Sequence, residues 1–285
     1  MKKHLLFMCT TALLLAAASP ASASQPPEVS ATAEIGVIRP LVHTIQIGEN
    51  GHELDYVSEG GQELLLPYSR FEVQVLANQR HEIAFLYQPL TLITSTRVES
   101  ANGILIDDVL FADNSPLDLK YGFDFYRGTY RYRIINSSAW QVSLGGALQI
   151  RNASIVFDGF AENDGELYET RVVTQDLGPV PVIASAARRS YENGVFIEAT
   201  LDGFYAPVRY LNLRDVDVIG WLYDGAVRAG TPLRDSAEAY ISLRFLGGGS
   251  DGTAGDRSRW TQSKDQPRYT SNNLNLVSLS LGARF

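Results

Sequence analysis

His43, His52 and His81 are the residues best suited to acid–base chemistry, and His52 has the most promising surroundings. Histidine titrates near neutral pH, so it can take up and release protons during hydrolysis. His52 lies close to Glu53 and Asp55 in a polar stretch, whereas the other two histidines fall within or beside expected strands. No serine near His52 stands in a recognisable motif with a matching acid, so no catalytic residue is assigned.

Acidic clusters are the second candidate for chemistry. Asp107-Asp108, the stretch 162–166 and Asp251 could offer carboxylate oxygens to Ca²⁺ or Mg²⁺. None of them has the spacing of a defined loop site, and solvated loops explain them as well. We therefore expect neither a metal site nor a cofactor.

A third set of charged residues alternates with apolar residues along the chain. In a strand, residues two apart share a face, so this alternation gives one charged face and one apolar face. The charged face is expected to contain Arg70, Glu72, Glu82, Lys120, Asp124, Arg127, Arg131, Arg133, Arg151, Glu198, Asp202, Asp224, Arg228, Glu238, Arg244 and Arg284. Inside a closed sheet such a mixture forms a salt-bridged filling, and a selectivity lining for a narrow pore is the alternative.

Ten strand candidates carry these residues. They lie at about 34–48, 70–77, 81–94, 117–135, 140–151, 180–190, 195–202, 219–228, 237–245 and 274–285. Short turns near residues 79, 137, 193 and 232 alternate with longer polar loops, among them 49–67, 95–116, 157–178 and 247–269. Asn193-Gly194 is the strongest hairpin signal. An even number of strands lets the last pair antiparallel with the first, although eight or twelve strands stay open as alternatives.

Three strands have irregular patterns. Arg39-Pro40 interrupts the first, and Pro89 predicts a bulge or the end of regular pairing in the third. In the fourth, the apolar face changes parity near Phe125-Tyr126, which predicts a β-bulge that keeps the aromatic residues outward. The aromatic residues expected to face lipid or its interfaces are Tyr87, Tyr121, Phe123, Tyr130, Trp140, Trp221, Tyr223 and Phe285.

The N-terminus has the pattern of a cleaved secretory signal. Lys2 and Lys3 precede an apolar run that ends before Ala21-Ser22-Ala23, a small-residue cleavage pattern. We expect a signal peptide at 1–23, a periplasmic lead-in at 24–33 and one domain at 34–285. Loss of the two lysines changes the formal net charge from −8 to −10, which disfavours nucleic acid as a partner. The single cysteine, Cys9, lies in the signal, so thiol chemistry is not expected.

The last strand gives the clearest statement about location. Val277, Leu279, Leu281 and Phe285 share one face, and the other face is polar. The sequence 280–285, with Ser280, Gly282 and the terminal Phe285, resembles the C-terminal assembly signal of Gram-negative outer-membrane β-barrels. Ala283 departs from that pattern, in which a bulkier apolar residue is usual.

This resemblance implies an all-β, single antiparallel barrel inserted in the cell outer membrane, with lipid and the barrel assembly machinery as partners. The expected role is structural, binding or that of a narrow, porin-like channel, carried by the extracellular loops. A barrel-embedded lipid or peptide hydrolase is the alternative. It would use the extracellular side, where proteases and lipid deacylases of this class hold their sites and where His52 is expected.

Overall fold

The computed structural model describes residues 26–163, 165–207, 217–234, 237–254 and 268–285, so the expected signal peptide lies outside the described residues. All regular structure in these ranges is β-strand, and they contain no helix able to span a membrane. The ring strands are β1 (Glu28–Ile47), β3 (Leu66–Ala77), β4 (His81–Gln88) continued by β5 (Thr91–Arg97), β8 (Pro116–Asn136), β9 (Trp140–Asn163), β10 (Glu166–Ser190), β11 (Phe196–Pro207), β12 (Asp217–Arg234), β13 (Ala237–Ala254) and β14 (Arg268–Arg284).

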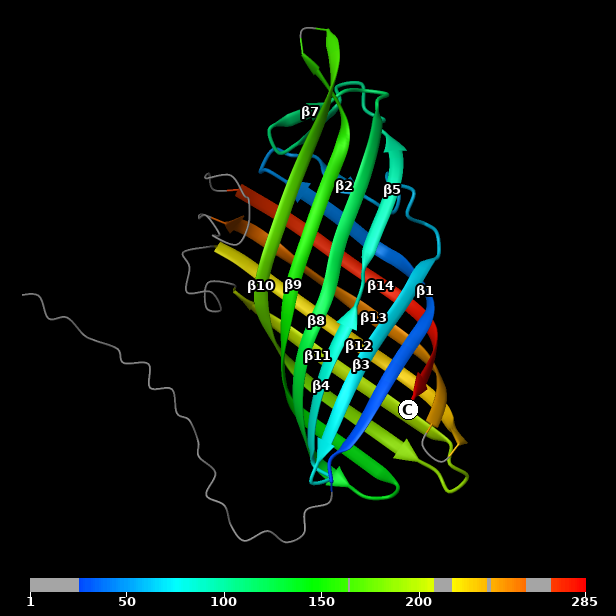
Figure 1. The fold of residues 1–285 in the computed structure, drawn as a ribbon. Coiled ribbons are helices and arrows are strands. Elements are labelled where there is room, and N and C mark those ends of the chain that lie inside the picture. Colours follow the sequence, from blue (N-terminus) through cyan, green and yellow to red (C-terminus); the bar gives the residue numbers. More distant parts are fainter. Residues whose placement is uncertain (1–25, 164, 208–216, 235–236, 255–267) are drawn as a thin grey trace, which may run out of the picture.

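The ring is closed and antiparallel, which confirms the predicted ten-stranded barrel (Figure 1). Neighbouring strands pair in chain order, with β4 and β5 occupying one position beside β8. The last strand closes the ring on the first, with Ile35 opposite Leu281 in the β1–β14 register. Because closure leaves no free edge, the backbone groups of the spanning strands are satisfied within the sheet.

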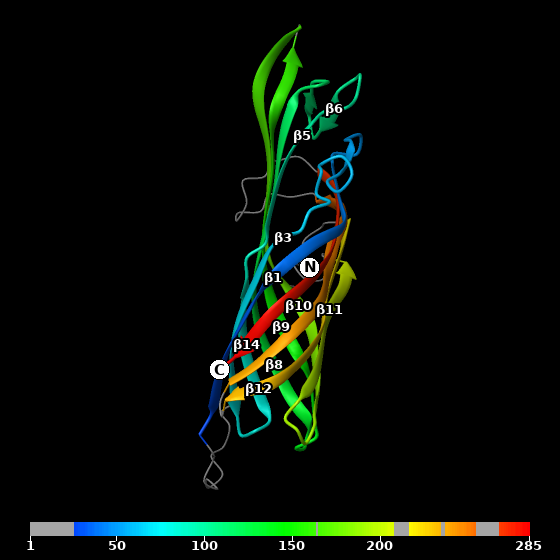
Figure 2. The same ribbon diagram turned by 90° about the vertical axis from the view of Figure 1, so that its right-hand side faces the viewer.

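Tight turns join the strands at one end of the barrel. Asn78 and Gln79 both have positive φ angles, 51° and 59°, in the three-residue turn that joins β3 to β4 between the paired Ala77 and His81. Gly194 has a φ of 82° in the turn between β10 and β11. We call this end of the barrel the short-turn end. The C-terminus also lies there in both views (Figures 1 and 2).

Both prolines that interrupt the sequence pattern mark irregular pairing. The register of β1 with β14 shifts between Pro40 and Val42, and the strand begins earlier than expected, at Glu28. Pro89 separates β4 from β5, because proline has no N–H to donate to the ladder. Asp124 on β8 compensates by accepting a hydrogen bond from the Leu90 N–H at 3.1 Å.

The expected loop at 157–178 is wrong, because β9 and β10 continue through it and pair without a break as far as Asn163 and Glu166. This hairpin extends past the other strands at the end opposite the short turns (Figure 2). We call this the long-loop end. Outward-facing polar residues such as Asp158 and Arg171 are tolerated in these strands, where they form an exposed ion pair.

Two connections at the long-loop end, residues 48–65 and 98–115, form a small folded head. They contain three short strands, β2 (Glu53–Asp55), β6 (Ile104–Ile106) and β7 (Val109–Phe111). Leu54, Tyr56, Ile106 and Phe111 are buried there against the inner face of the tall strands. Apolar burial, rather than solvated polar loops, therefore organises this end of the molecule.

The predicted bulge at Phe125-Tyr126 is also wrong. Strand β8 pairs continuously through both residues, and its register with β9 shifts only between Arg133 and Ile135. Tyr121 and Phe125 are buried inside the barrel, whereas Tyr130 is exposed on the outside. Phe123 packs against the interior cluster. The faces do not change along the strand; instead, the interior itself changes from apolar to charged.

The outer surface of the ring is an apolar belt typical of a lipid-facing barrel. Outward residues on different strands include Ile35, Ile83, Leu144, Leu201 and Leu243, each between 47% and 65% exposed. Charged outward residues occur beyond the belt, as at Arg39 and Lys120 toward the long-loop end. Lys120 was expected inside, and that expectation is wrong because the inward residues of its neighbourhood are apolar.

Candidate functional site

An apolar layer crosses the lumen on the long-loop side of the barrel centre. Inward side chains from every position of the ring contribute to it, because each strand points alternate residues inward. The layer consists of buried Ile38, Tyr68, Leu92, Phe125, Ile155, Val182, Leu222, Leu246 and Leu276, with the half-buried Phe204 completing it at β11. It joins the core of the head without interruption.

A layer of charges begins one inward position nearer the short turns. Asp224 follows Leu222 by two residues in β12, and its side chain is only 1% exposed. It accepts hydrogen bonds from Arg70 Nη1 at 3.3 Å, from Arg127 Nη1 at 3.0 Å and from Arg244 Nη1. Three strands on different sides of the ring are thus bound to one carboxylate, because guanidinium groups carry several donors around a fixed plane.

Arg127 uses nearly all of its donors within this layer. Its Nη1 also donates to Asp202, and its Nε and Nη2 donate to Gln149 Oε1 at 2.9 and 2.7 Å. Arg70 donates in addition to Gln88 Oε1 at 2.8 Å. The second oxygen of Asp202, Oδ1, is buried and has no partner within the described part of the chain.

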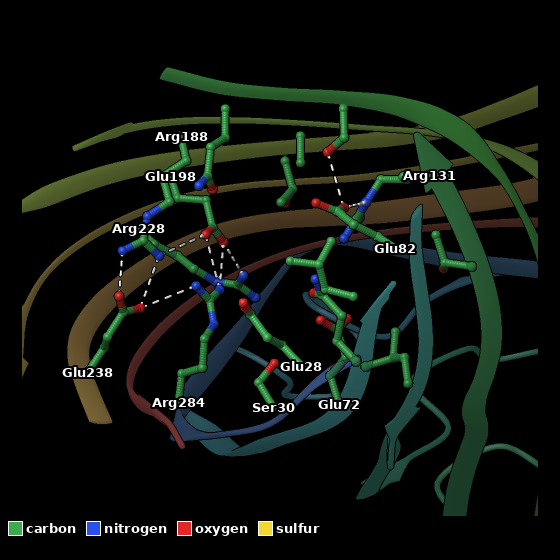
Figure 3. Close-up of a pocket in the computed structure, with 18 of the residues that line it drawn as sticks. Glu28, Ser30, Glu72, Glu82, Arg131, Arg188, Glu198, Arg228, Glu238 and Arg284 are labelled. Carbon is green, nitrogen blue, oxygen red and sulfur yellow. Dashed lines mark hydrogen bonds and ion pairs between the residues drawn. The ribbon is translucent and has the colours of Figure 1, made fainter. Parts of the chain in front are cut away.

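A second group of ion pairs links six consecutive positions of the ring, from β10 through β14 to β1. Figure 3 shows its members Arg188, Glu198, Arg228, Glu238 and Arg284. Arg228 donates to Glu34 and to Glu198, both at 2.6 Å. Arg284 donates to Glu198 at 3.0 Å and to Glu238 at 3.2 Å. Arg188 binds Glu238 at 2.9 Å. This group crosses the β1–β14 seam, so it stabilises the closure of the ring.

A third group lies on the opposite wall. Glu82 accepts hydrogen bonds from the Nε atoms of Arg131, at 3.0 Å, and Arg133. Ser143 donates to the same carboxylate at 3.2 Å. Glu72, on the neighbouring strand β3, has no hydrogen-bonding partner among the described residues (Figure 3).

Between these groups lies a cavity of about 580 Å³, which we call the vestibule. Its lining runs from Arg70 and Arg127 at mid-barrel to Glu28 and Phe285 at the strand ends, so it faces the short-turn end. Charges of both signs cover its wall, and Thr200 and Ser143 are among its uncharged polar residues. The arrangement can hold water and small polar groups, but the apolar layer ends the vestibule toward the head.

The structure brings together most of the residues that the alternation selected. The layer of charges around Asp224 and the second and third groups of ion pairs together contain Arg70, Glu82, Arg127, Arg131, Arg133, Glu198, Asp202, Asp224, Arg228, Glu238, Arg244 and Arg284. Glu72 lines the vestibule without a hydrogen-bonding partner in the described part of the chain, and Asp124 lies at the Pro89 break instead. The side chain of Arg151 lies outside the described residues.

Two important residues of the lumen ion-pair network, Glu34 and Arg188, were not predicted from the sequence. Glu34 is fully buried and bonded to Arg228, Tyr240 and Ser280, but it begins a strand whose pattern is weak. Arg188 lies over the Phe196 ring at 3.8 Å from its centroid. The Asn193-Gly194 turn in the sequence could have identified Arg188 as an inward residue, because the turn fixes the end of the strand and strand residues alternate between the two faces from there.

The residues of the C-terminal pattern have distinct positions. Ser280 faces the lumen, where its hydroxyl lies 3.3 Å from Glu34 Oε2. Gly282 lies against Tyr240, and a Cβ added there would come within 2.3 Å of the ring. Phe285 is 63% exposed, and its backbone pairs with Ala31 of β1.

The three histidines do not form a common site, because each contacts a different side chain. His43 is buried, stacks on Tyr56 and binds Gln62 at 2.7 Å. His52 pairs with Glu59 at 2.8 Å, and His81 contacts the Tyr130 hydroxyl at 3.0 Å. Within the described ranges, no three His, Cys, Asp or Glu side chains gather closely enough to hold a metal.

The closed antiparallel ring, its apolar belt and its charged interior define the fold of a Gram-negative outer-membrane β-barrel. The chain is similar in structure to the outer membrane protease OmpT from Escherichia coli, with a TM-score of 0.51 and 10% identity over 93% of this chain and 99% of that one. Weaker likenesses are to Ail, the attachment invasion locus protein of Yersinia pestis (TM-score 0.33, 12% identity, 90% and 99% covered), and to the Pseudomonas putida toluene transporter TodX (0.33, 7%, 92% and 91%). No protein-family model and no curated protein sequence matches the chain.

Proposed function

We propose that this protein is a non-conducting outer-membrane barrel that anchors a folded, partner-binding head on the extracellular side. The apolar layer carries this proposal, because it receives a side chain from every position of the ring and continues into the head. Ions do not cross a dry apolar constriction readily, so such a barrel suits anchoring better than transport. The signal-like sequence pattern at 1–23 and the C-terminal pattern support the further proposal that the protein is exported and inserted by the barrel assembly machinery.

The head supplies the binding surface in this proposal. The β9–β10 hairpin is the part of the ring that extends farthest from the short turns (Figure 2). Near the tip of this hairpin, Leu167 and Tyr168 are 59% and 50% exposed although they lie beyond the apolar belt. Exposed apolar side chains rimmed by acidic ones, such as Glu166 and Glu169, are typical of protein-binding surfaces.

The geometry around His52 favours a non-catalytic role. A hydrolase with a serine nucleophile needs the serine and histidine within hydrogen-bond reach. Here Ser58 Oγ donates to Asp55 at 2.7 Å, while His52 binds a different carboxylate, that of Glu59. A purified His52→Gln variant should therefore bind partners as the wild type does, and hydrolysis that disappears in this variant would favour the enzyme.

Side-specific thiol labelling tests the closed lumen. Cys9 is the only cysteine, so a chain without the signal offers a clean background for single substitutions. Thr200→Cys places a thiol in the vestibule, and Glu99→Cys places one on the exposed head. In oriented proteoliposomes, an impermeant thiol reagent should modify these two positions from opposite sides. Modification of both from the same side would show an open lumen and overturn the proposal.

A further inference from the structure

One arginine lies on the lipid-facing surface without a carboxylate partner. Arg189 of β10 pairs in register with Trp140 and Ile197, both outward-facing and exposed. Its guanidinium carbon is 5.0 Å from the centroid of the Trp140 ring and 5.5 Å from that of Tyr191. Among the described residues it makes no ion pair or hydrogen bond.

The position of Arg189 next to the short turn places it at the edge of the apolar belt. A charged side chain costs about 0 to 1 kcal/mol near such an interface, compared with about 2 to 4 kcal/mol at the middle of the bilayer. Cation–π contact with the indole and phenol rings uses the charge of the guanidinium but none of its N–H donors. These donors point to an oxyanion ligand at this depth.

A second arginine lies at the same end of the barrel. Arg80 lies 5.9 Å from the centroid of the Tyr132 ring and donates one hydrogen bond to the Arg133 carbonyl oxygen. His81 contacts Tyr132 edge-on, with ring centroids 5.3 Å apart. Because β4, β8, β9 and β10 are neighbours, these residues occupy one sector of the ring. The basic-aromatic patch is defined as Arg80, His81, Tyr132, Trp140, Arg189 and Tyr191.

Four other strands differ at this level. Their outward residues near the short turns are uncharged, as Val29 in β1, Ile197 in β11, Ala239 in β13 and Ala283 in β14 illustrate. An interfacial belt of aromatic residues alone would not need arginines gathered on one side. The asymmetry therefore indicates recognition of a ligand and not only anchoring in lipid.

We propose that the basic-aromatic patch binds the phosphate headgroup of an anionic phospholipid in the leaflet at the short-turn end. Arg189, held between Trp140 and Tyr191, contacts the phosphate oxygens, and Arg80 adds positive charge beside it. The proposal uses the membrane location proposed above but does not depend on whether the lumen conducts.

Lipid retention in native mass spectrometry tests this site. The purified barrel is mixed with equal amounts of phosphatidylglycerol and phosphatidylcholine in detergent. The wild type should retain phosphatidylglycerol preferentially. Arg189→Gln should lower that retention roughly fivefold, since one arginine near a lipid surface contributes about 1 kcal/mol and about 1.4 kcal/mol is tenfold. Arg189→Lys keeps the charge but loses the planar stack, so an intermediate loss is expected.

Arg39→Gln is the matched control, because Arg39 is also an outward arginine but lies toward the other end of the belt. Its retention should equal that of the wild type. Equal retention in the wild type and Arg189→Gln, or an equal loss in Arg39→Gln, would overturn the site. A wild type without preference for the anionic lipid would do so too, even if a variant failed to fold. If the chain were not a membrane protein, it would stay soluble without detergent, a result separate from any lipid preference.

Discussion

Asp224→Asn is the most informative perturbation of the lumen, because it removes one charge and almost no volume. The carboxylate is 1% exposed and is bonded to Arg70, Arg127 and Arg244. Unit charges about 4 Å apart attract by about 4 kcal/mol at an effective dielectric constant of about 20. Three such contacts offset a desolvation cost of several kcal/mol per ion, so removal of the anion leaves three arginines uncompensated.

The expected loss is about 3 to 5 kcal/mol in the free energy of unfolding, the range for breaking a buried pair. Urea titration of the barrel in phospholipid vesicles, followed by tryptophan fluorescence, measures it. Asp158→Asn is the matched control, since Asp158 pairs with Arg171 on the surface and such pairs contribute about 0 to 1 kcal/mol. If both variants lost less than about 1 kcal/mol, water would reach Asp224 and the buried network would be refuted.

Three further predictions follow from individual residues. Leu281→Asp places a charge on the lipid face of β14 and should impair insertion; normal amounts of heat-modifiable barrel in the outer membrane would contradict the assignment of this strand. A spin label at position 130 should be accessible to a lipid-soluble relaxant and one at Phe123 should not, because Tyr130 faces outward and Phe123 packs inside; equal accessibility would contradict this placement. Burial raises the pKa of Asp55 in the head, but hydrogen bonds from Ser58 and from the Val57 N–H outweigh it and hold the pKa below its ordinary value of 3.8. The stabilisation of this turn is thus present above that value and is lost as the pH falls through the lowered pKa. Protection of the Val57 amide hydrogen, measured as its exchange rate relative to the intrinsic rate at the same pH, should therefore be lost only in acid, and Asp55→Asn should abolish the transition.

The sequence pattern was sufficient to predict the ring of strands, because apolar residues in each strand recur with a period of two and residues that favour tight turns separate the strands. Asn78 and Gln79, for instance, lie where the apolar alternation stops, and the structure places them in the three-residue turn between β3 and β4. The alternation also selected Arg127, Arg131 and Asp224 for the lumen. It could not give their partners, because a strand's own sequence contains no information about which residues face it across the ring.

The failures have a common physical cause. Alternation separates two faces but does not say which one is inside. At Tyr121 and Lys120 the apolar face is inside and the charged face outside, the reverse of the arrangement at Tyr130 and Arg131. The expectation of a polar lumen along the whole barrel therefore required a bulge at Phe125 that does not exist. Glu34 was missed because Arg39-Pro40 weakens the pattern of its strand, and its partner Arg228 is 194 residues away in the sequence.

Single-channel recording of the wild-type barrel in a planar bilayer tests the central claim most directly. The apolar layer and the layer of charges around Asp224 close the lumen of the barrel. Insertion should therefore produce no stable conductance above the lipid background. Insertion can be verified independently by proteolysis of the head from one side of the membrane. Large, stable currents from verified, folded protein would show an open aqueous path and contradict the account of a closed anchor.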